Sequence, residues 1–246
     1  MQLVFLGTTG YHPSETRQTA CLMLPELGIV LDAGTGMFRV GPRLVTEELD
    51  IFLSHAHLDH IIGLTFLHDM FVGREMRRVT IHGAADKLDA VRAHLFAKPL
   101  FPVDPPWEFH ALDGEVSLAQ QGRLTHFPLI HPGGSTGFRL DWPGKSMAYV
   151  TDTTATSEAD YLQHIEGVDL LVHECYFGDA MADWARTTGH SHTTPVAEVA
   201  RQARVGRLLL VHVNPLGPEP DAIDLRVARK IFPQTEIATD LLEVDF

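Results

Sequence analysis

One short segment holds four side chains that could bind metal ions. Residues 54–60 read Ser-His-Ala-His-Leu-Asp-His and follow directly on a short apolar run. Imidazole nitrogen and carboxylate oxygen are ligands of zinc, and a catalytic zinc keeps one position open for water. His55 and His57 are two residues apart, so in an extended segment they project to the same side. Asp59 and His60 follow as the chain turns, so they can face a second metal beside the first.

The pattern His-Ala-His-Leu-Asp-His resembles the signature of the metallo-β-lactamase-fold hydrolases, and further matches follow in order along the whole chain. The resemblance implies an α/β fold, the four-layer αββα sandwich of the metallo-β-lactamase type, as a single domain over residues 1–246. It also implies two metals at one edge of the paired sheets. The remaining metal ligands are then expected at the ends of later strands.

Three later residues end apolar strands and fit those positions. His131 precedes a Gly-rich turn, Asp152 lies between two threonines, and His212 precedes a turn that contains Pro215. The family pattern implies two sets of ligands that are bridged by Asp152: His55, His57 and His131 for one metal, and Asp59, His60 and His212 for the other.

Other stretches are similar to the ribonuclease Z-like phosphodiesterase branch. They are Leu-Gly-Thr at 6–8, Asp-Leu-Leu-Val-His-Glu at 169–174 and Gly-His-Ser-His at 189–192. The turn after His131 is ambiguous, because it contains both the Gly-Phe-Arg of this branch and a Gly-Ser typical of thioester hydrolases.

The resemblance implies a hydrolase with two divalent ions, expected to be zinc, with manganese or iron as alternatives. It would cleave small or nucleotide-derived phosphodiesters through a hydroxide that bridges the metals, since two metals can activate water and clamp the phosphoryl oxygens. A thioesterase or lactonase could use the same metals. A metal-loaded binding or sensor protein is the non-enzymatic alternative.

Five acidic or imidazole side chains are candidates for proton transfer and for orienting the ligands. Asp59 could accept the proton of the metal-bound water while also binding metal. His190, oriented by Glu174, is the candidate that protonates the leaving alkoxide, and His192 stays open because one sequence cannot fix a two-residue shift. Asp32 is expected to order ligand histidines through their other ring nitrogen, with a turn-forming role as the alternative.

Two departures argue against processing of tRNA 3′ ends. Only 20 residues separate His131 from Asp152, too few for the tRNA-binding arm that ribonuclease Z typically carries there. Nineteen basic against 32 acidic residues give a net charge of −13, whereas nucleic-acid affinity depends on Lys and Arg contacts to phosphate. We therefore expect a small-molecule substrate and no nucleic-acid partner, and a homodimer is left open.

Composition agrees with a cytoplasmic protein without a membrane partner. The 246 residues suit one large α/β domain, and no apolar run approaches the roughly 20 residues of a membrane span. The start of the chain lacks the basic lead of a signal peptide. Cys21 and Cys175 are too few for a disulfide framework and are expected to be buried.

Periodicity predicts the elements that must position these residues. Runs at 3–6, 19–24 and 28–32 predict antiparallel strands, and a short helix is predicted over 44–49 before a strand at 51–54. Further helices are predicted over 59–70, 84–96, 157–165, 194–204 and 221–231. Further strands are predicted at 78–81, within 107–151, at 168–173, at 207–212 and within 236–245. The loop 98–106 contains four prolines and cannot be regular helix.

Overall fold

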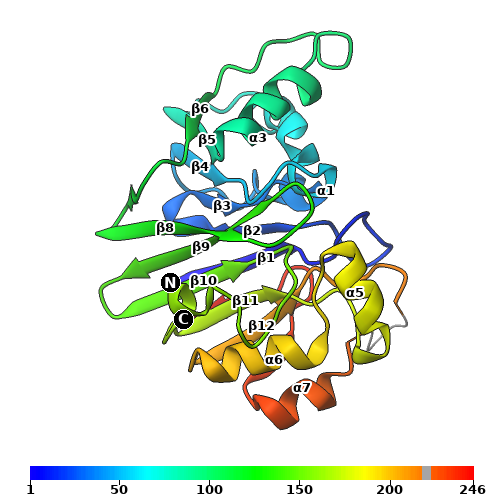
Figure 1. Cartoon of the computed structure of the whole chain (residues 1–246). Helices are drawn as coiled ribbons and strands as arrows, with labels where there is room; N and C mark the ends of the chain where they lie inside the picture. The colour runs from blue at the N-terminus through cyan, green and yellow to red at the C-terminus, as the bar shows by residue number, and fades with distance from the viewer. Residues whose placement is uncertain (218–222) are drawn as a thin grey trace. The chain divides into compact units, whose positions relative to one another are not determined.

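The computed structural model describes residues 1–217 and 223–246, and the chain falls into two compact units. Unit 1 comprises residues 1–113 and 240–245, and unit 2 comprises residues 114–239 and 246. Within the described residues, each unit contains one seven-stranded mixed sheet accompanied by helices (Figure 1). The single domain over 1–246 stays a prediction.

The sheet of unit 1 has the strand order β14-β1-β2-β3-β4-β5-β6. From β14 to β3 the neighbouring strands are antiparallel, and from β3 to β6 they are parallel. The antiparallel strands predicted at 3–6, 19–24 and 28–32 are confirmed as β1, β2 and β3. The bounds are β1 (Gln2–Gly7), β2 (Cys21–Leu24), β3 (Ile29–Leu31), β4 (Glu48–Phe52), β5 (Arg78–Gly83), β6 (Glu108–Ala111) and β14 (Glu243–Asp245).

The helix predicted over 84–96 is confirmed, whereas the other two helices predicted in unit 1 differ from the structure. The helices of unit 1 are η1 (Pro25–Leu27), η2 (Thr35–Arg39), α1 (Leu58–Ile61), η3 (Ile62–Phe66), α2 (Leu67–Met70), α3 (Ala85–Ala90) and η4 (Val91–Leu95). The helix predicted over 44–49 is wrong, because β4 already begins at Glu48 and pairs with both β3 and β5. The helix predicted over 59–70 is divided into three pieces. At Gly63 the chain packs so closely that a Cβ atom there would lie 2.3 Å from the carbonyl oxygen of Gly34.

The sheet of unit 2 has the strand order β13-β12-β11-β10-β9-β8-β7. It is antiparallel from β7 to β10 and parallel from β10 to β13. The bounds are β7 (Val116–Leu118), β8 (Gly122–Leu129), β9 (Ser135–Trp142), β10 (Lys145–Val150), β11 (Leu170–Glu174), β12 (Arg207–Val211) and β13 (Thr235–Ile237).

The helices of unit 2 are α4 (Leu162–Ile165), η5 (Asp179–Met181), α5 (Ala182–Thr188), α6 (Thr193–Gln202) and α7 (Leu225–Ile231). The helix predicted over 194–204 is confirmed as α6, and α4 is only the last turn of the one predicted over 157–165. Of the helix predicted over 221–231, residues 221 and 222 lie outside the described residues. The sequence analysis missed α5, which precedes Gly189.

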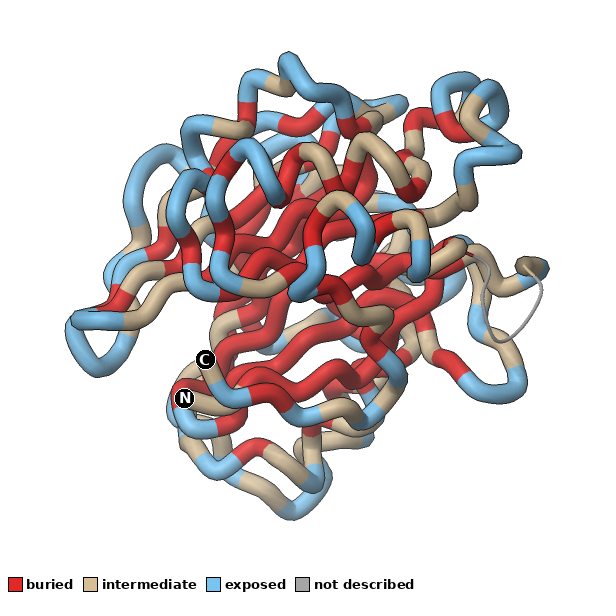
Figure 2. Tube along the Cα trace, turned by 90° about the horizontal axis from the view of Figure 1, so that it is seen from below, coloured by how far each residue is buried: buried red, intermediate tan, exposed pale blue. Residues whose placement is uncertain are grey.

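Each unit has a hydrophobic core on its own sheet, and the buried residues follow the strands while the turns are exposed (Figure 2). Both cysteines are buried and free, as predicted. Among the residues that the structure describes, no helix is long and apolar enough to cross a membrane. Neighbouring parallel strands end at the same edge of a sheet, so the parallel half of each sheet can bring polar residues from several strand ends together.

Candidate metal centre

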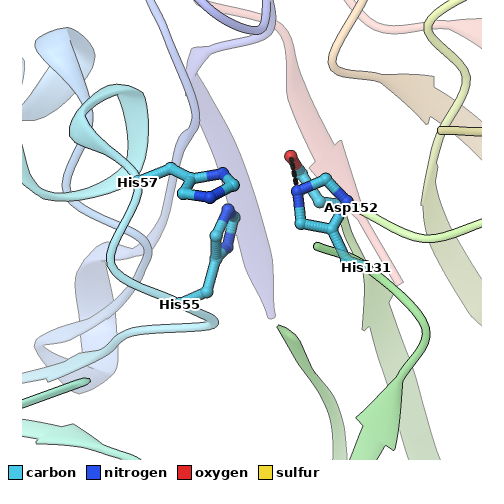
Figure 3. Close-up of side chains that lie close together, drawn as sticks. All are labelled: His55, His57, His131 and Asp152. Atoms are coloured by element: carbon cyan, nitrogen blue, oxygen red, sulfur yellow. Dashed lines mark ion pairs between the residues drawn. The ribbon is translucent and has the colours of Figure 1, made fainter. Parts of the chain in front are cut away.

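In unit 1, the chain leaves β4 into residues 54–60, which we call the metal loop. Its three histidine rings are close neighbours: the centroids of His55 and His57 are 4.5 Å apart, and those of His55 and His60 are 4.3 Å apart. His55 and His60 are buried, whereas His57 is exposed. Figure 3 shows the rings of His55 and His57 edge to face in the first half of this loop. The metal loop therefore presents three imidazoles as one group.

Asp32 holds the metal loop from the end of β3, the parallel neighbour of β4. Its fully buried carboxylate accepts hydrogen bonds from the backbone N–H and hydroxyl of Ser54, both at 2.8 Å, and from Nδ1 of His60 at 2.8 Å. Nδ1 of His55 lies 3.0 Å from the Ser54 hydroxyl oxygen. These contacts put the N–H of both rings on Nδ1 and the lone pair on Nε2, where a metal can bind.

The backbone of Asp32 is in the left-handed region, with φ of 58°. A residue with a side chain is strained there, and such strain is found preferentially at functional sites. Asp32 thus makes the contact that the sequence analysis expected of it, at a conformational cost that the surrounding structure must offset.

Asp59 also points its carboxylate toward the histidines. Its Oδ2 accepts a hydrogen bond of 2.7 Å from the backbone N–H of Tyr11 and lies 3.4 Å from Nε2 of His60. Two ligand atoms bound to one tetrahedral ion are about 3.4 Å apart, since metal–nitrogen bonds are about 2.1 Å long. The spacing between Asp59 and His60 therefore suits two ligands of a single ion.

In unit 2, the two carboxylate oxygens of Asp152 face two different histidines. Oδ2 lies 3.5 Å from Nε2 of His131, the pair joined by the dashed line in Figure 3, and Oδ1 lies 3.3 Å from Nε2 of His212. Both distances match the spacing of two ligands on one tetrahedral ion. The donor atoms of Asp152 therefore fit a carboxylate that binds two ions, one through each oxygen.

His131 is held by a backbone hydrogen bond, and His212 lies at a strained strand end. Nδ1 of His131 donates to the carbonyl oxygen of Gly189 at 2.8 Å, which leaves Nε2 to face Asp152. Burial lowers the pKa of His131 below its usual value, against the opposing charge of Asp152, and this direction favours the neutral imidazole that can bind a metal. His212 follows β12 with φ of 56°, a second strained position at a strand end.

His190 lies against the fully buried Glu174 at the end of β11. Its Nδ1 is 3.2 Å from Oε1 of Glu174 and 4.0 Å from Oδ2 of Asp152. Oε1 of Glu174 also accepts from the backbone N–H of Thr153 at 2.9 Å, and Oε2 is buried without a hydrogen-bond partner among the described residues. Asp152, His190 and His212 each offer a donor atom within 4.8 Å of the others, so His190 lies beside the carboxylate of Asp152.

His192, the alternative to His190, has a different partner. Its Nδ1 donates to Asp179 at 2.7 Å, and the same carboxylate accepts from the backbone N–H and hydroxyl of Thr194 at the start of α6. His192 therefore contacts the carboxylate that caps helix α6. His190 instead contacts Glu174, the residue that was expected to orient it.

Tyr176 is a site residue that the sequence analysis missed. Its ring stacks on His190 with the centroids 4.8 Å apart, and it lies 5.5 Å from the ring of His212. The sequence spacing could have predicted it. Tyr176 follows Glu174 by two residues, and in an extended segment both side chains point to the same side.

Comparisons with known proteins show what the chain is similar to. The family model described as Beta-lactamase superfamily domain matches residues 28–213. Ribonuclease BN of Escherichia coli O6:K15:H31 (strain 536 / UPEC) is 27% identical over 308 aligned positions, which cover 98% of each sequence. The metallo-beta-lactamase fold protein YhfI from Bacillus subtilis superposes with a TM-score of 0.82 at 20% identity, over 99% of this chain and 98% of that one. A diphosphatase from the PhnP family superposes with a TM-score of 0.75 at 20% identity, over 100% of this chain and 96% of that one.

The structural likenesses confirm the fold class predicted from the sequence, the α/β fold of the metallo-β-lactamase type. The alignment with Ribonuclease BN runs over 308 positions although this chain has 246 residues, so that relative contains segments which this chain lacks.

Proposed function

The chain belongs to the beta-lactamase superfamily, and from that premise we propose that it is a dinuclear metal-dependent phosphodiesterase acting on small or nucleotide-derived substrates. One metal would be held by His55, His57 and His131, and the other by Asp59, His60 and His212, with Asp152 as the bridge. Zinc suits the imidazole-rich donor set best, although manganese and iron accept the same atoms.

The observation that carries this proposal is the geometry of Asp152. Each of its oxygens lies within 3.5 Å of the Nε2 atom of a different histidine. A carboxylate that served only as a hydrogen-bond acceptor would be expected closer, at about 2.7–2.9 Å from an imidazolium N–H. The longer spacing on both sides is what two ions between the carboxylate and its histidines require.

When bound, two such ions supply a hydroxide at neutral pH and neutralise charge on the phosphoryl oxygens. The protein's own residues then orient the metal ligands, accept a proton from water and donate a proton to the leaving oxygen. Asp32 keeps the lone pairs of the metal-loop histidines on Nε2. The carboxylate of Asp59, 3.4 Å from His60, is placed to accept a proton from water.

His190 would donate the proton to the leaving oxygen. Glu174 lies on the Nδ1 side of the ring, so the proton would be delivered from Nε2. The carboxylate of Glu174 is fully buried, so its charge acts on the neighbouring imidazole with little screening by water. The ring of Tyr176 stacks on His190 and limits its rotation.

Cleavage of RNA is the second candidate, favoured by the likeness to Ribonuclease BN over almost the full length of both sequences. The net charge of −13 and the shorter chain favour the small substrate instead.

The experiment that tests the proposal combines metal analysis with three substrates. Protein never exposed to chelator should contain about two divalent ions per chain, and chelation should abolish turnover. Bis-(p-nitrophenyl) phosphate should be hydrolysed in preference to a thioester and a lactone. Metal content near zero, with no uptake of added zinc or manganese, would contradict the dinuclear centre. A preference for the thioester or lactone would contradict the phosphodiesterase.

A further inference from the structure

Tyr161 and His173 form a buried polar pair in unit 2 that the proposed mechanism does not use. The hydroxyl oxygen of Tyr161 lies 2.9 Å from Nε2 of His173, and Nδ1 of His173 lies 2.7 Å from the carbonyl oxygen of Glu174. Neighbouring residues of a strand point to opposite faces of the sheet. His173 accordingly faces Tyr161 in the core of unit 2, while the carboxylate of Glu174 faces His190. The pair therefore acts on the site through the backbone of Glu174.

The hydrogen bonds of this pair run in one direction. Burial lowers the pKa of His173 and raises the pKa of Tyr161, which favours a neutral imidazole with one N–H and a protonated phenol. A backbone carbonyl only accepts, so the proton of His173 is on Nδ1 and Nε2 is left as an acceptor. The hydroxyl of Tyr161 then donates to Nε2. Tyr161 and the carbonyl of Glu174 together fix the tautomer and the ring orientation of His173.

His173 supplies a hydrogen bond where the pairing between two strands ends. The last pair of the β10–β11 ladder is Val150 with His173, so Glu174 has no paired residue on β10. On the other side of the same peptide group, the N–H of Cys175 donates to the carbonyl oxygen of Val211 at 2.9 Å. The N–H and C=O of a trans peptide point in opposite directions. His173 and Val211 therefore hold the peptide between Glu174 and Cys175 from both sides.

This peptide begins the segment that contacts His190. Oε1 of Glu174 lies 3.2 Å from Nδ1 of His190, and the ring of Tyr176 stacks on the ring of His190. The N–H of Phe177 donates to the carbonyl oxygen of Ser191 at 3.2 Å. The segment that starts at Glu174 thus meets the chain around His190 in three places, and the orientation of its first peptide decides where these contacts fall.

We propose that Tyr161 and His173 are positioning residues for His190. Tyr161 holds the imidazole of His173, and His173 holds the peptide of Glu174, from which the carboxylate reaches His190. The inference rests on the proposed function, because His190 acts as an acid only if an ester is cleaved. It adds that protonation of the leaving group depends on a hydrogen-bonded pair in the core of unit 2.

Two substitutions and two esters test this role. Tyr161→Phe removes the hydroxyl that donates to His173, and His173→Leu removes the donor to the carbonyl of Glu174. Each should lower kcat on an alkyl phosphodiester by roughly 10-fold, a part of the ~10²–10⁴-fold that general acid catalysis supplies. Each should leave kcat on a p-nitrophenyl ester nearly unchanged, because that leaving group needs no proton. Metal content should equal that of the wild type.

Two further variants separate this role from a loosened core. The amide nitrogen of asparagine can take the place of Nδ1, so His173→Asn should keep most of the rate on the alkyl ester. Phe127→Leu is the matched control, since Phe127 is buried and stacks on Tyr161 without a hydrogen bond to it. It should change both rates by the same factor. Equal rates of His173→Asn and His173→Leu on the alkyl ester, or the same response of both esters to Tyr161→Phe, would overturn the proposal.

Failure of the proposed function would look different, because the wild type would then hydrolyse neither ester. NMR of the imidazole nitrogens still decides the positioning role in that case. The wild type should show His173 with the proton on Nδ1, and Tyr161→Phe should shift the Nε2 signal toward that of a nitrogen without a hydrogen bond. The amide proton of Cys175 should exchange with solvent faster in His173→Leu than in His173→Asn. The opposite tautomer in the wild type, or equal exchange in the two variants, would overturn the positioning role.

Discussion

At the scale of single residues, carboxylates decide what the histidines can do. Asp32 binds Nδ1 of His60 directly and reaches His55 through Ser54, so it sets the orientation of two proposed ligands. Asp152 faces two imidazoles with its two oxygens. Asp32 orients the imidazole rings and does not itself bind an ion in the proposed centre, whereas Asp152 would bind both ions.

This difference predicts unequal effects of two alanine substitutions. Asp152→Ala should lose metal and most of the turnover, because it removes the proposed bridge. Asp32→Ala should lower turnover by ~10–100-fold through disorder of the ligand rings. Metal content and kcat of both variants measure this, with thermal unfolding as a control because metal loss can also unfold a site. Equal and mild effects of the two substitutions would argue against the bridge.

The pair of His190 and Glu174 predicts a dependence on the leaving group. His190→Ala should slow an alkyl phosphodiester far more than a p-nitrophenyl ester, because p-nitrophenolate leaves without a proton. The contrast should reach ~10²–10⁴-fold, the usual size of general acid catalysis, and kcat on both esters measures it.

His192→Ala is the matched control, since His192 contacts Asp179 at the start of α6 and not Glu174. It should affect both esters alike. Equal slowing of both esters by His190→Ala, or loss of metal from that variant, would show that the assigned role is wrong.

At the scale of elements, the parallel half of each sheet positions the site. Asp32 and the metal loop follow β3 and β4, which are adjacent and parallel. Asp152, Glu174 and His212 follow or end β10, β11 and β12, which are also adjacent and parallel. The stability of these strands is therefore a condition for the geometry of the site.

Asp50 on β4 forms side-chain hydrogen bonds to two residues of the neighbouring strand β5. It accepts hydrogen bonds from Arg78 at 2.7 Å and 2.8 Å and lies 2.9 Å from Nε2 of His82. Although burial works to raise the pKa of Asp50, the hydrogen bonds from His82 and Arg78 lower it to about 2. An unfolded Asp has a pKa of about 3.9, so the Asp50 carboxylate stabilises the fold above about pH 4. That contribution is lost as the pH falls from about 4 to about 2.

Asp50→Asn should accordingly lower the free energy of unfolding by about 1–2 kcal/mol at pH 7, since Arg78 is partly exposed and its ion pair is screened. The difference from the wild type should shrink as the pH falls toward 2. Urea unfolding of metal-free protein as a function of pH measures both. Asp89→Asn, at an exposed pair with Arg92, is the control and should change stability by less than about 0.5 kcal/mol. A difference that is constant with pH would contradict this role of Asp50.

At the scale of the whole molecule, charge and length favour small substrates. The net charge of −13 gives no electrostatic attraction for a polyanion, and two divalent ions would reduce it only in part. The connection of 20 residues between His131 and Asp152 is occupied by β9 and β10 with their turns. It therefore contains no arm for tRNA.

The protein should for these reasons bind tRNA weakly and process tRNA precursors inefficiently. Binding measured between low and physiological salt should show no steep loss of affinity, since few phosphate contacts would release counterions. Hydrolysis of bis-(p-nitrophenyl) phosphate by the same preparation controls for loss of metal. Tight, strongly salt-dependent binding with specific cleavage at the 3′ end would contradict this prediction.

The sequence by itself pointed to the candidate ligands through local patterns, and the fold class followed from the family that those patterns resemble. An apolar strand that ends on His or Asp, as before His131, Asp152 and His212, is readable from composition and spacing. The six residues from His55 to His60 need no tertiary information to be recognised as a metal-binding pattern.

The tertiary structure decided what depends on packing between distant segments. The sequence favoured His190 but left His192 open. The structure separates them, because His190 contacts Glu174 at a strand end and His192 contacts Asp179 at the start of α6. The helix predicted over 59–70 changes from α-helix to 3-10 helix after Ile61, where the backbone of His60 and of Gly63 hydrogen-bonds to Ala33, about thirty residues earlier in the chain. Local helix propensity contains no information about such a contact. Long-range pairing likewise made Glu48 the start of a strand where periodicity favoured a helix.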